Sequence, residues 1–511
     1  MGLWICTVLT THLYAQNNTI QATKQDTHKT TSPTKTAKTA SLESIIARAL
    51  TNSVQADLIK ASSDLAKSGT IKAQAPLDVH FDSSLQLTHA IPDNLSGDRP
   101  LTPAPAVDST QQAQWKNTVS KGFVTGTRVA LDVTAGVRDS TFEKQTDLKP
   151  TYNTDLTLSV SQNLIKNHLG TSWQLAQNIA FGAIEAEKMA MQVKLQKLVV
   201  SIVKQFFALK KLQTEYISTV AKHKKSEDIL SKARMLFQRG NLEEANLYQI
   251  DIRVKIFNDL KKHTHLSLTN TWDNIVEQLS LDESYLSMDP SSIQLSYVNQ
   301  RHNYLKTCNT PILWDNIAEY QQLKKQYQNH SEQIQLLKEN EKPSLDAGVS
   351  FNLSNKEDNF TDSLTDSLSA QHSTLSFNLT YKQSLSNHVI KADLWQKTQQ
   401  STISHLTLKS FQSQRESAIR NSCRKIQHLR LKEKSLAVIY AQQQKRASLE
   451  QARFNIGKQD YFKATEGSID AIDAKYRLDM LKYDLEQEIW QLHYLSGELK
   501  QTSYENKVFK P

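Results

Sequence analysis

The chain of 511 residues has little glycine, proline and cysteine, with 13, 11 and 3 residues of each. Such low glycine and proline exclude a collagen-like chain and a fold made throughout of short strands and turns, and they favour long uninterrupted helices. Three cysteines exclude a disulfide-rich scaffold. No internal run approaches the roughly 18 apolar residues of a membrane-spanning helix, so a multi-span helical membrane protein is excluded too.

Motifs of enzymes and metal sites are also missing. The sequence has no P-loop, nucleophile elbow, HExxH or catalytic carboxylate pair. Cys308 and Cys423 lack the spacing of a zinc site; two inert or packed thiols are favoured, with a disulfide between them as the alternative. His263 and His265 form an H-x-H without further ligands, which predicts a solvated helix patch. We therefore predict that the chain is not an enzyme and holds no metal or cofactor.

The charge of the chain is moderately basic, with 61 Lys+Arg against 52 Asp+Glu and a formal net charge of +9. The basic residues are spread along the sequence, and aromatic residues are not interleaved with them as in nucleic-acid-binding surfaces. We attribute the excess to solvated helix faces and predict no nucleic-acid partner.

The first residues resemble an export signal. Residues 1–15 combine a short apolar core with a small residue, Ala15, and predict a secretory signal peptide cleaved after it, although no Lys or Arg precedes Lys24. A misassigned start codon or a buried N-terminal segment are the alternatives. Residues 16–40 are rich in Thr, Gln, Lys and Ala, which predicts a polar linker.

Five segments alternate apolar with polar, often hydroxyl-bearing residues, and this period of two predicts strands. They lie at 79–88, 128–138, 155–161, 345–353 and 374–381. A soluble sandwich gives this pattern, and so does a transmembrane β-barrel with apolar side chains toward lipid. The membrane interpretation is favoured because the helices offer little surface to cover a sheet. So few strands cannot close a barrel, and lipid does not tolerate open edges, so several chains must share it.

Long helical patterns separate these strands. Residues 171–238 contain no proline and one glycine, which predicts a helix about 100 Å long. Within it, apolar residues from Leu195 to Leu209 recur at coiled-coil spacings of 4 and 3. After Gly240 a second helical pattern continues to about Leu281. Helices of this length predict an elongated molecule.

The second half of the chain repeats the first. A shift of 217 residues places Ile202, Phe206, Phe237 and Gly240 on Ile419, Cys423, Phe454 and Gly457. The order of short helix, strands, long helix, glycine turn and medium helix begins again near Thr310, which indicates an internal duplication. A short helix stacked on a medium one is about as long as the long helix and is expected to lie beside it.

In their order and duplication, four stretches carry a resemblance to a known family: Ser41–Asn52, Gln162–Gly170, Phe237–Leu247 and Ala452–Ala464. Over residues 41–499 the chain resembles the TolC-type outer-membrane efflux proteins, the outer-membrane factors of tripartite efflux and type I secretion systems. The resemblance implies a mixed α and β membrane protein: a homotrimer with a 12-stranded transmembrane β-barrel, four strands per chain, on a long α-helical coiled-coil tunnel.

The chain departs from the family in several places. Asn163 and Ser384 stand where the family usually has proline, and Leu236 stands where the second repeat has the usual Arg453. Residues 92–128 are surplus to the family pattern and are expected to form an extra hairpin or an extracellular loop.

These patterns predict a division of the chain. It has the signal peptide at 1–15, the linker at 16–40, a short helix at 41–76, strands and loops at 77–170, a helical hairpin at 171–283, a linker at 284–310, a short helix at 311–342, strands at 343–387, a helical hairpin at 388–499 and a tail at 500–511.

The two glycine turns are the candidate contact site, since glycine allows the chain to reverse between helices. The resemblance implies that they form the periplasmic tip, which docks an adaptor. The residues of this tip are Phe237, Arg239, Gly240, Asn241, Arg453, Phe454, Gly457 and Lys458. Lys463 and Glu466 occupy positions where family members narrow the tunnel, and Asn246 and Gln249 match them in the first repeat. A solvated pair on the helix surface is the alternative.

The leading hypothesis is a passive exit channel in the outer membrane of a Gram-negative bacterium, with a large periplasmic part. Its expected partners are two further copies, a periplasmic adaptor (membrane fusion) protein, an inner-membrane transporter and outer-membrane lipid. The exit duct of type I protein secretion is an alternative, and a secreted coiled-coil scaffold or adhesin is an alternative of another class. A nucleic-acid-binding coiled coil is disfavoured by the signal-like start and the strands.

Overall fold

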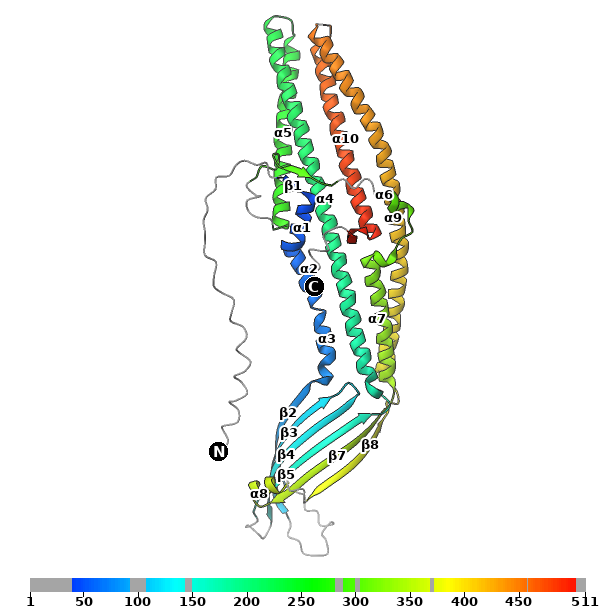
Figure 1. Cartoon of the computed structure of the whole chain (residues 1–511). Coiled ribbons are helices and arrows are strands. Elements are labelled where there is room, and N and C mark those ends of the chain that lie inside the picture. The colour runs from blue at the N-terminus through cyan, green and yellow to red at the C-terminus, as the bar shows by residue number, and fades with distance from the viewer. Residues whose placement is uncertain are drawn as a thin grey trace.

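A computed structural model describes residues 39–91, 107–142, 149–280, 288–298, 304–367, 372–456 and 458–501. The predicted signal peptide, most of the predicted linker and tail, and Gly457 lie outside these residues. The described chain is elongated, with helices along most of its length and one sheet at an end (Figure 1). Within the described ranges, no helix combines the length and apolar character needed to cross a membrane.

Two helices of 68 residues, α4 (Thr171–Gln238) and α9 (His388–Asn455), run the length of the helical part and are offset by the 217 residues of the predicted duplication. Helix α4 has the bounds that the sequence predicts. Each folds back on a shorter helix, α5 (Glu244–Gln278) or α10 (Tyr461–Ser496). Each repeat therefore contains one long helical hairpin.

Short helices continue the line of the shorter hairpin arms toward the sheet (Figure 1). In the first repeat, three of them follow one another and pack on α4: α1 (Leu42–Asn52), α2 (Val54–Asp64) and α3 (Lys67–Gln74). In the second repeat, α7 (Ala318–Glu341) packs on α4 and α9. The expected stacking of short helices beside a long one is confirmed.

The main core lies where α1, α4 and α5 meet. Ile202, Phe206 and Leu209 of the coiled-coil stripe are almost completely buried, together with Leu42 and Trp272. The stripe points inward because its spacing keeps one side of α4 apolar. Helix α1 starts at this core because the Ser41 hydroxyl accepts a hydrogen bond from the amide of Ser44 at 3.1 Å.

Six antiparallel strands form the large sheet, in the order β2-β3-β4-β5-β7-β8. Their bounds are β2 Val79–Ala90, β3 Val107–Gly122, β4 Thr127–Phe142, β5 Thr151–Asn163, β7 Ser344–Glu357 and β8 Ser373–Lys382. The five predicted strands correspond to β2, β4, β5, β7 and β8. The sixth, β3, lies in the surplus segment 92–128, and its run of Gln, Lys, Asn and Ser hides its alternation. The chain thus differs from the four strands that the family resemblance implies.

The register of the sheet separates apolar from polar side chains. One cross-strand row consists of apolar residues: Phe81, Val119, Leu131, Leu158, Phe351 and Leu375. The next row is polar: Asp82, Thr118, Asp132, Thr157, Asn352 and Thr374. Since neighbouring rows point to opposite faces, one face of the sheet is apolar and the other polar.

The connection between the repeats crosses the middle of the helical part. There β1 (Thr39–Ser41) pairs in parallel with β6 (Gln294–Ser296), and α6 (Tyr304–Asn309) follows. Cys308 of α6 and Cys423 of α9 form a disulfide. The favoured prediction of two thiols is therefore wrong, because the topology brings α6 against α9, which sequence spacing does not reveal.

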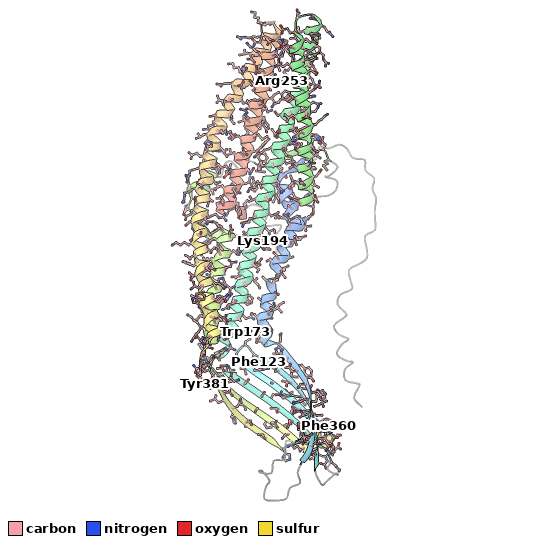
Figure 2. All side chains as sticks on the ribbon, turned by 180° about the vertical axis from the view of Figure 1, so that it is seen from behind. Phe123, Trp173, Lys194, Arg253, Phe360 and Tyr381 are labelled. Carbon is pink, nitrogen blue, oxygen red and sulfur yellow. A yellow bond between two sulfur atoms is a disulfide. The ribbon has the colours of Figure 1, made fainter. Side chains whose placement is uncertain are left out.

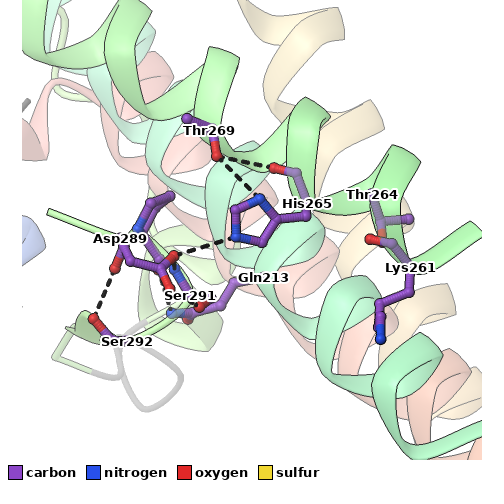
Figure 3. A network of polar contacts seen from close by, with 9 residues as sticks. Gln213, Lys261, Thr264, His265, Thr269, Asp289, Ser291 and Ser292 are labelled. Atoms are coloured by element: carbon purple, nitrogen blue, oxygen red, sulfur yellow. Dashed lines mark hydrogen bonds and ion pairs between the residues drawn. The ribbon is translucent and has the colours of Figure 1, made fainter. Parts of the chain in front are cut away.

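A polar network ties this connection to α4 and α5 (Figure 3). His265 Nε2 lies 3.6 Å from Asp289 Oδ1, and the Gln213 amide donates to the carbonyl of Ile293 at 2.7 Å. Burial alone would raise the pKa of Asp289, but hydrogen bonds from Ser291 and the neighbouring His265 outweigh it and hold the pKa below its usual range. His265 is therefore a structural contact and not merely part of a solvated patch.

The remaining short elements complete the fold. They are the 3₁₀ turns η1 (Ala75–Leu77), η2 (His168–Gly170), η4 (Trp314–Asn316) and η5 (Glu498–Gln501), and helix α8 (Phe360–Ser367) between β7 and β8.

Candidate functional site

The apolar face of the sheet is the first candidate site, because its large side chains are exposed. Phe81 is 65% exposed, Leu375 58% and Phe377 75%. The long helices continue beyond the end of the sheet and do not lie over it (Figure 1). A contiguous apolar surface of this kind marks a contact with another protein or with a membrane.

The polar face carries a hydrogen-bonded set of hydroxyl, amide and charged groups. Thr118 Oγ1 donates to Asp132 Oδ1 at 2.5 Å, and Lys116 Nζ lies 3.4 Å from the same oxygen. Further along the sheet the Asn352 amide donates to Thr157 Oγ1 at 2.8 Å. Such a face is suited to water and can line a wet passage.

Aromatic side chains lie at both ends of the sheet (Figure 2). Phe123, Trp173 and Tyr381 lie where the sheet meets the helices, and Phe360 of α8 lies at the far end. The Phe360 ring packs edge-on against Tyr152, with 6.3 Å between centroids. Aromatic residues at the two borders of an apolar band are typical of barrels in an outer membrane.

Helix α8 covers the far end of the apolar face. Its Ser363 hydroxyl lies 3.2 Å from the Thr154 hydroxyl and 3.1 Å from the carbonyl of Asn355. Thr154 and Asn355 are paired in the register and share the face of Leu156 and Leu353. Only that end of the apolar band is therefore shielded by this helix, which sequence analysis missed because FTDSLTDS is too short for a clear period.

The two hairpin turns form the second candidate site, and they have the same cap geometry. In repeat one the amide of Asn241 donates to the carbonyl of Leu236, and in repeat two Lys458 donates to Arg453, both at 2.9 Å. The two pairs are offset by 217 residues, and in the first repeat the bond closes a helix that ends in a left-handed residue. Gly240 is that residue, with φ of +73°.

The two turns lie at the same end of the molecule, opposite the sheet (Figure 1). The predicted tip residues of both repeats are thus brought together, Gly457 excepted because it is outside the described residues. Phe237 is 39% exposed, whereas the Phe454 ring packs on Tyr461 with centroids 4.9 Å apart. Lys232 Nζ lies 5.6 Å from the Phe454 centroid. Phe454 therefore supports the tip, and Phe237 is the more available for contact.

The predicted constriction residues lie on α10 close to this end. Lys463 and Glu466 are both exposed, and no described ion pair joins them. Glu466 lines a cavity of about 540 Å³ together with Asn246 and Gln249, their counterparts in the first repeat. Of the two predicted constriction residues, Glu466 therefore lines this cavity and Lys463 does not.

The two lateral sides of the chain are a third candidate site, one that the sequence did not single out. On one side lie β2 and α3, and on the other β8 and α9 (Figure 1). Helix α9 exposes Trp395 at 69%, and on the opposite side α3 exposes Ile71 at 71%. Apolar surface on both sides is suited to contact between copies.

The chain is similar to known proteins in its fold and not in its sequence. Neither a family model nor a curated protein matches the sequence. Among solved structures, the outer membrane protein VceC of Vibrio cholerae is 11% identical with a TM-score of 0.63, covering 89% of this chain and 96% of that chain.

Two further structures agree with it. The outer membrane channel CmeC of Campylobacter jejuni is 11% identical with a TM-score of 0.65, covering 91% of this chain and 89% of that chain. The MtrE outer membrane channel of Neisseria gonorrhoeae, in its open state, is 10% identical with a TM-score of 0.60, covering 89% and 88%. The chain therefore has the fold of these outer-membrane proteins, consistent with the TolC-type family that its sequence resembles.

Proposed function

We propose that the chain is a passive exit channel in the outer membrane of a Gram-negative bacterium, formed by three copies that share one barrel and one periplasmic tunnel. The observation that carries the proposal is the exposed apolar face of the sheet, at the end of helices about 100 Å long. Lipid would cover that face, and the polar face would line the passage. The helices are long enough to reach deep into the periplasm.

The lateral sides support assembly from several copies. Since the exposed apolar residues of α9 and those of α2 and α3 lie on opposite sides, contact between them is head-to-tail. Head-to-tail contacts close into a ring when the rotation between copies allows it. The number three comes from the family resemblance.

The far end of the hairpins is the proposed contact for a periplasmic adaptor. The exposed Phe237 and the turn around Gly240 would receive it, and the packing of Phe454 on Tyr461 would keep the tip rigid. Because the sequence has no P-loop, energy would come from an inner-membrane transporter. Lys463 and Glu466, three of each, would ring the mouth of the tunnel.

Two other functions compete with small-molecule efflux. The exit duct for type I protein secretion needs the same architecture, and a neighbouring transporter gene of either class would separate the two. A secreted coiled-coil scaffold would bury the apolar sheet face against its own helices, and the exposed row from Phe81 to Leu375 argues against it.

A pair of substitutions on neighbouring residues of β5 tests the proposal. Leu158 lies on the apolar face and is 47% exposed, while Thr157 lies on the polar face. Leu158→Arg puts a charge into lipid, at a cost of about 2–4 kcal/mol near the membrane midplane. We expect it to abolish recovery from the outer membrane, whereas Thr157→Arg should insert and conduct ions in planar bilayers without an energy source.

The controls define what would defeat the proposal. The wild-type protein must give stable conductance steps in the bilayer, and Thr157→Arg should alter its ion selectivity. If both arginine variants are recovered as soluble protein in an aqueous fraction, as the wild type then also would be, the apolar face does not meet lipid. The scaffold interpretation would then replace the channel.

A further inference from the structure

The sheet has two free edges, and each must be paired if it lies in a membrane. Within the described sheet, β2 pairs only with β3, and β8 only with β7. An unpaired backbone amide or carbonyl in hydrocarbon costs several kcal/mol. Resting on the proposed function, we propose that β8 of each copy pairs with β2 of the next, so that three copies close a barrel of 18 strands and not the 12 that four strands per chain would give.

The direction of the strands allows this join. Strand β2 runs from the helical end of the sheet to the far end, and the strands then alternate until β8 returns to the start of α9. With six strands per chain, β8 and the next β2 run in opposite directions and can form an antiparallel ladder. Their lengths of 10 and 12 residues match the roughly 9–11 residues that cross a membrane.

The hairpin of β2 and β3 is part of the apolar band and not an appended loop. All 12 residues of β2 pair with β3. Phe81, Leu85 and Trp115 on this hairpin are 65%, 66% and 53% exposed and continue the apolar row of the other strands. Left outside the barrel, these side chains would face water, so the hairpin belongs in the membrane with the rest of the sheet.

The stagger of the strands predicts the register of the join. The row that starts at Val79, the first residue of β2, ends at Phe377, which is five residues before the last residue of β8. When this row is continued into β2 of the next copy, it meets that strand a certain number of residues after Val79, and we call this number the step. Only an even step keeps apolar residues on one face. A step of six places Phe377 opposite Leu85 of the next copy.

This step agrees with the geometry of closed barrels. Six residues of rise over six strand spacings correspond to a tilt of about 35°, at the lower end of the usual range. In the same register Asp82 and Thr380 face each other on the polar side, and Leu87 meets Leu375 on the apolar side. Since barrel diameter grows roughly linearly with strand number, the lumen would be about 1.5 times as wide as with 12 strands.

Cysteine pairs in the full-length protein distinguish this join from the alternative. Thr380→Cys is combined with Asp82→Cys, which tests pairing of β8 with β2, or with Ala130→Cys, which tests pairing with β4 in a 12-stranded barrel. Within one chain the two members of either pair are five or three strand spacings apart, about 24 Å or 14 Å across the sheet before their offset along the strands is added, which is too far for an internal disulfide. His80→Cys and Ser84→Cys, each with Thr380→Cys, detect a register two residues away.

Oxidation in isolated outer membranes followed by non-reducing electrophoresis gives the result. We expect linked species up to three chains with Asp82→Cys, and none with Ala130→Cys or with any single cysteine. Three results in protein recovered from the outer membrane would overturn the 18-stranded barrel and leave the channel proposal intact. They are disulfide linking only in the variant that combines Thr380→Cys with Ala130→Cys, linked species of no more than two chains, and no linking at all. Protein absent from the outer membrane would overturn the proposed function instead.

Discussion

The disulfide between Cys308 and Cys423 is expected to stabilise the protein by an amount that depends on the length of the loop that it closes. The bond joins residues 115 positions apart, and the loop that it closes contains α7, β7, β8 and the first half of α9. Both cysteines pack beside a buried cluster that includes Ile419, Ile426 and Leu485. Breaking the bond should therefore loosen the attachment of α6 to α9 and release a loop that carries two strands of the sheet.

The expected loss of stability can be worked from the loop length. Chain-entropy arithmetic gives about 5 kcal/mol for a loop of this size, and measured disulfides typically contribute about 2–4 kcal/mol. Unfolding entropy for a chain of this length is about 1 kcal/mol per kelvin. We expect Cys308→Ser to lower the Tm of the detergent-solubilised protein by about 2–5 °C.

The assay combines thermal unfolding with thiol counting in a Cys6→Ala background. Cys308→Ser, Cys423→Ser and the double variant should lose the same stability, because each removes the same bond, and reductant should lower the Tm of the parent but not of the double variant. A disulfide is expected on the oxidising side of the inner membrane. Two alkylatable thiols in protein taken from the outer membrane, or a Tm that reductant does not move, would refute this reasoning.

Three further predictions concern individual residues. Gly170→Ala should lower the free energy of unfolding by about 2–5 kcal/mol, because φ is +80° and a Cβ would overlap the carbonyl group of Val124 in the turn between β3 and β4. Gly240→Ala, with φ of +73° and open space around it, should lower it by only about 1–2 kcal/mol. Lys463→Glu should raise the cation selectivity of single channels, and unchanged selectivity would exclude a constriction there. The hydrogen bond from His493 lowers the pKa of Glu498. The contribution of this carboxylate to the Tm should be constant above the ordinary glutamate pKa of about 4.3 and fall as the pH drops through the lowered value. This pH-dependent contribution should be absent in Glu498→Gln.

The helices and the duplication were predictable because their signals are long and local. The apolar stripe of α4 extends over many turns, and a helix without proline for 68 residues has few alternatives. The turn geometry was predictable as well, since Gly240 supplies a left-handed residue where the chain reverses.

What the sequence did not reveal depends on contacts between distant segments. Strand β3 is polar along most of its length and is recognised as a strand only through its pairing with β2 and β4. Cys308 and Cys423 become partners only when α6 crosses α9. The shared barrel depends on the free edges of β2 and β8. The strand order places these two strands at the edges, and the sequence does not reveal that order.

The mass of the detergent-extracted protein tests the central proposal most directly. Size exclusion with light scattering on an outer-membrane extract should give a protein mass about three times the 57.9 kDa of one chain, less any signal peptide, with no protein in the soluble fraction. A soluble monomer or dimer would contradict the account, because the apolar face of the sheet would then have no membrane to cover it.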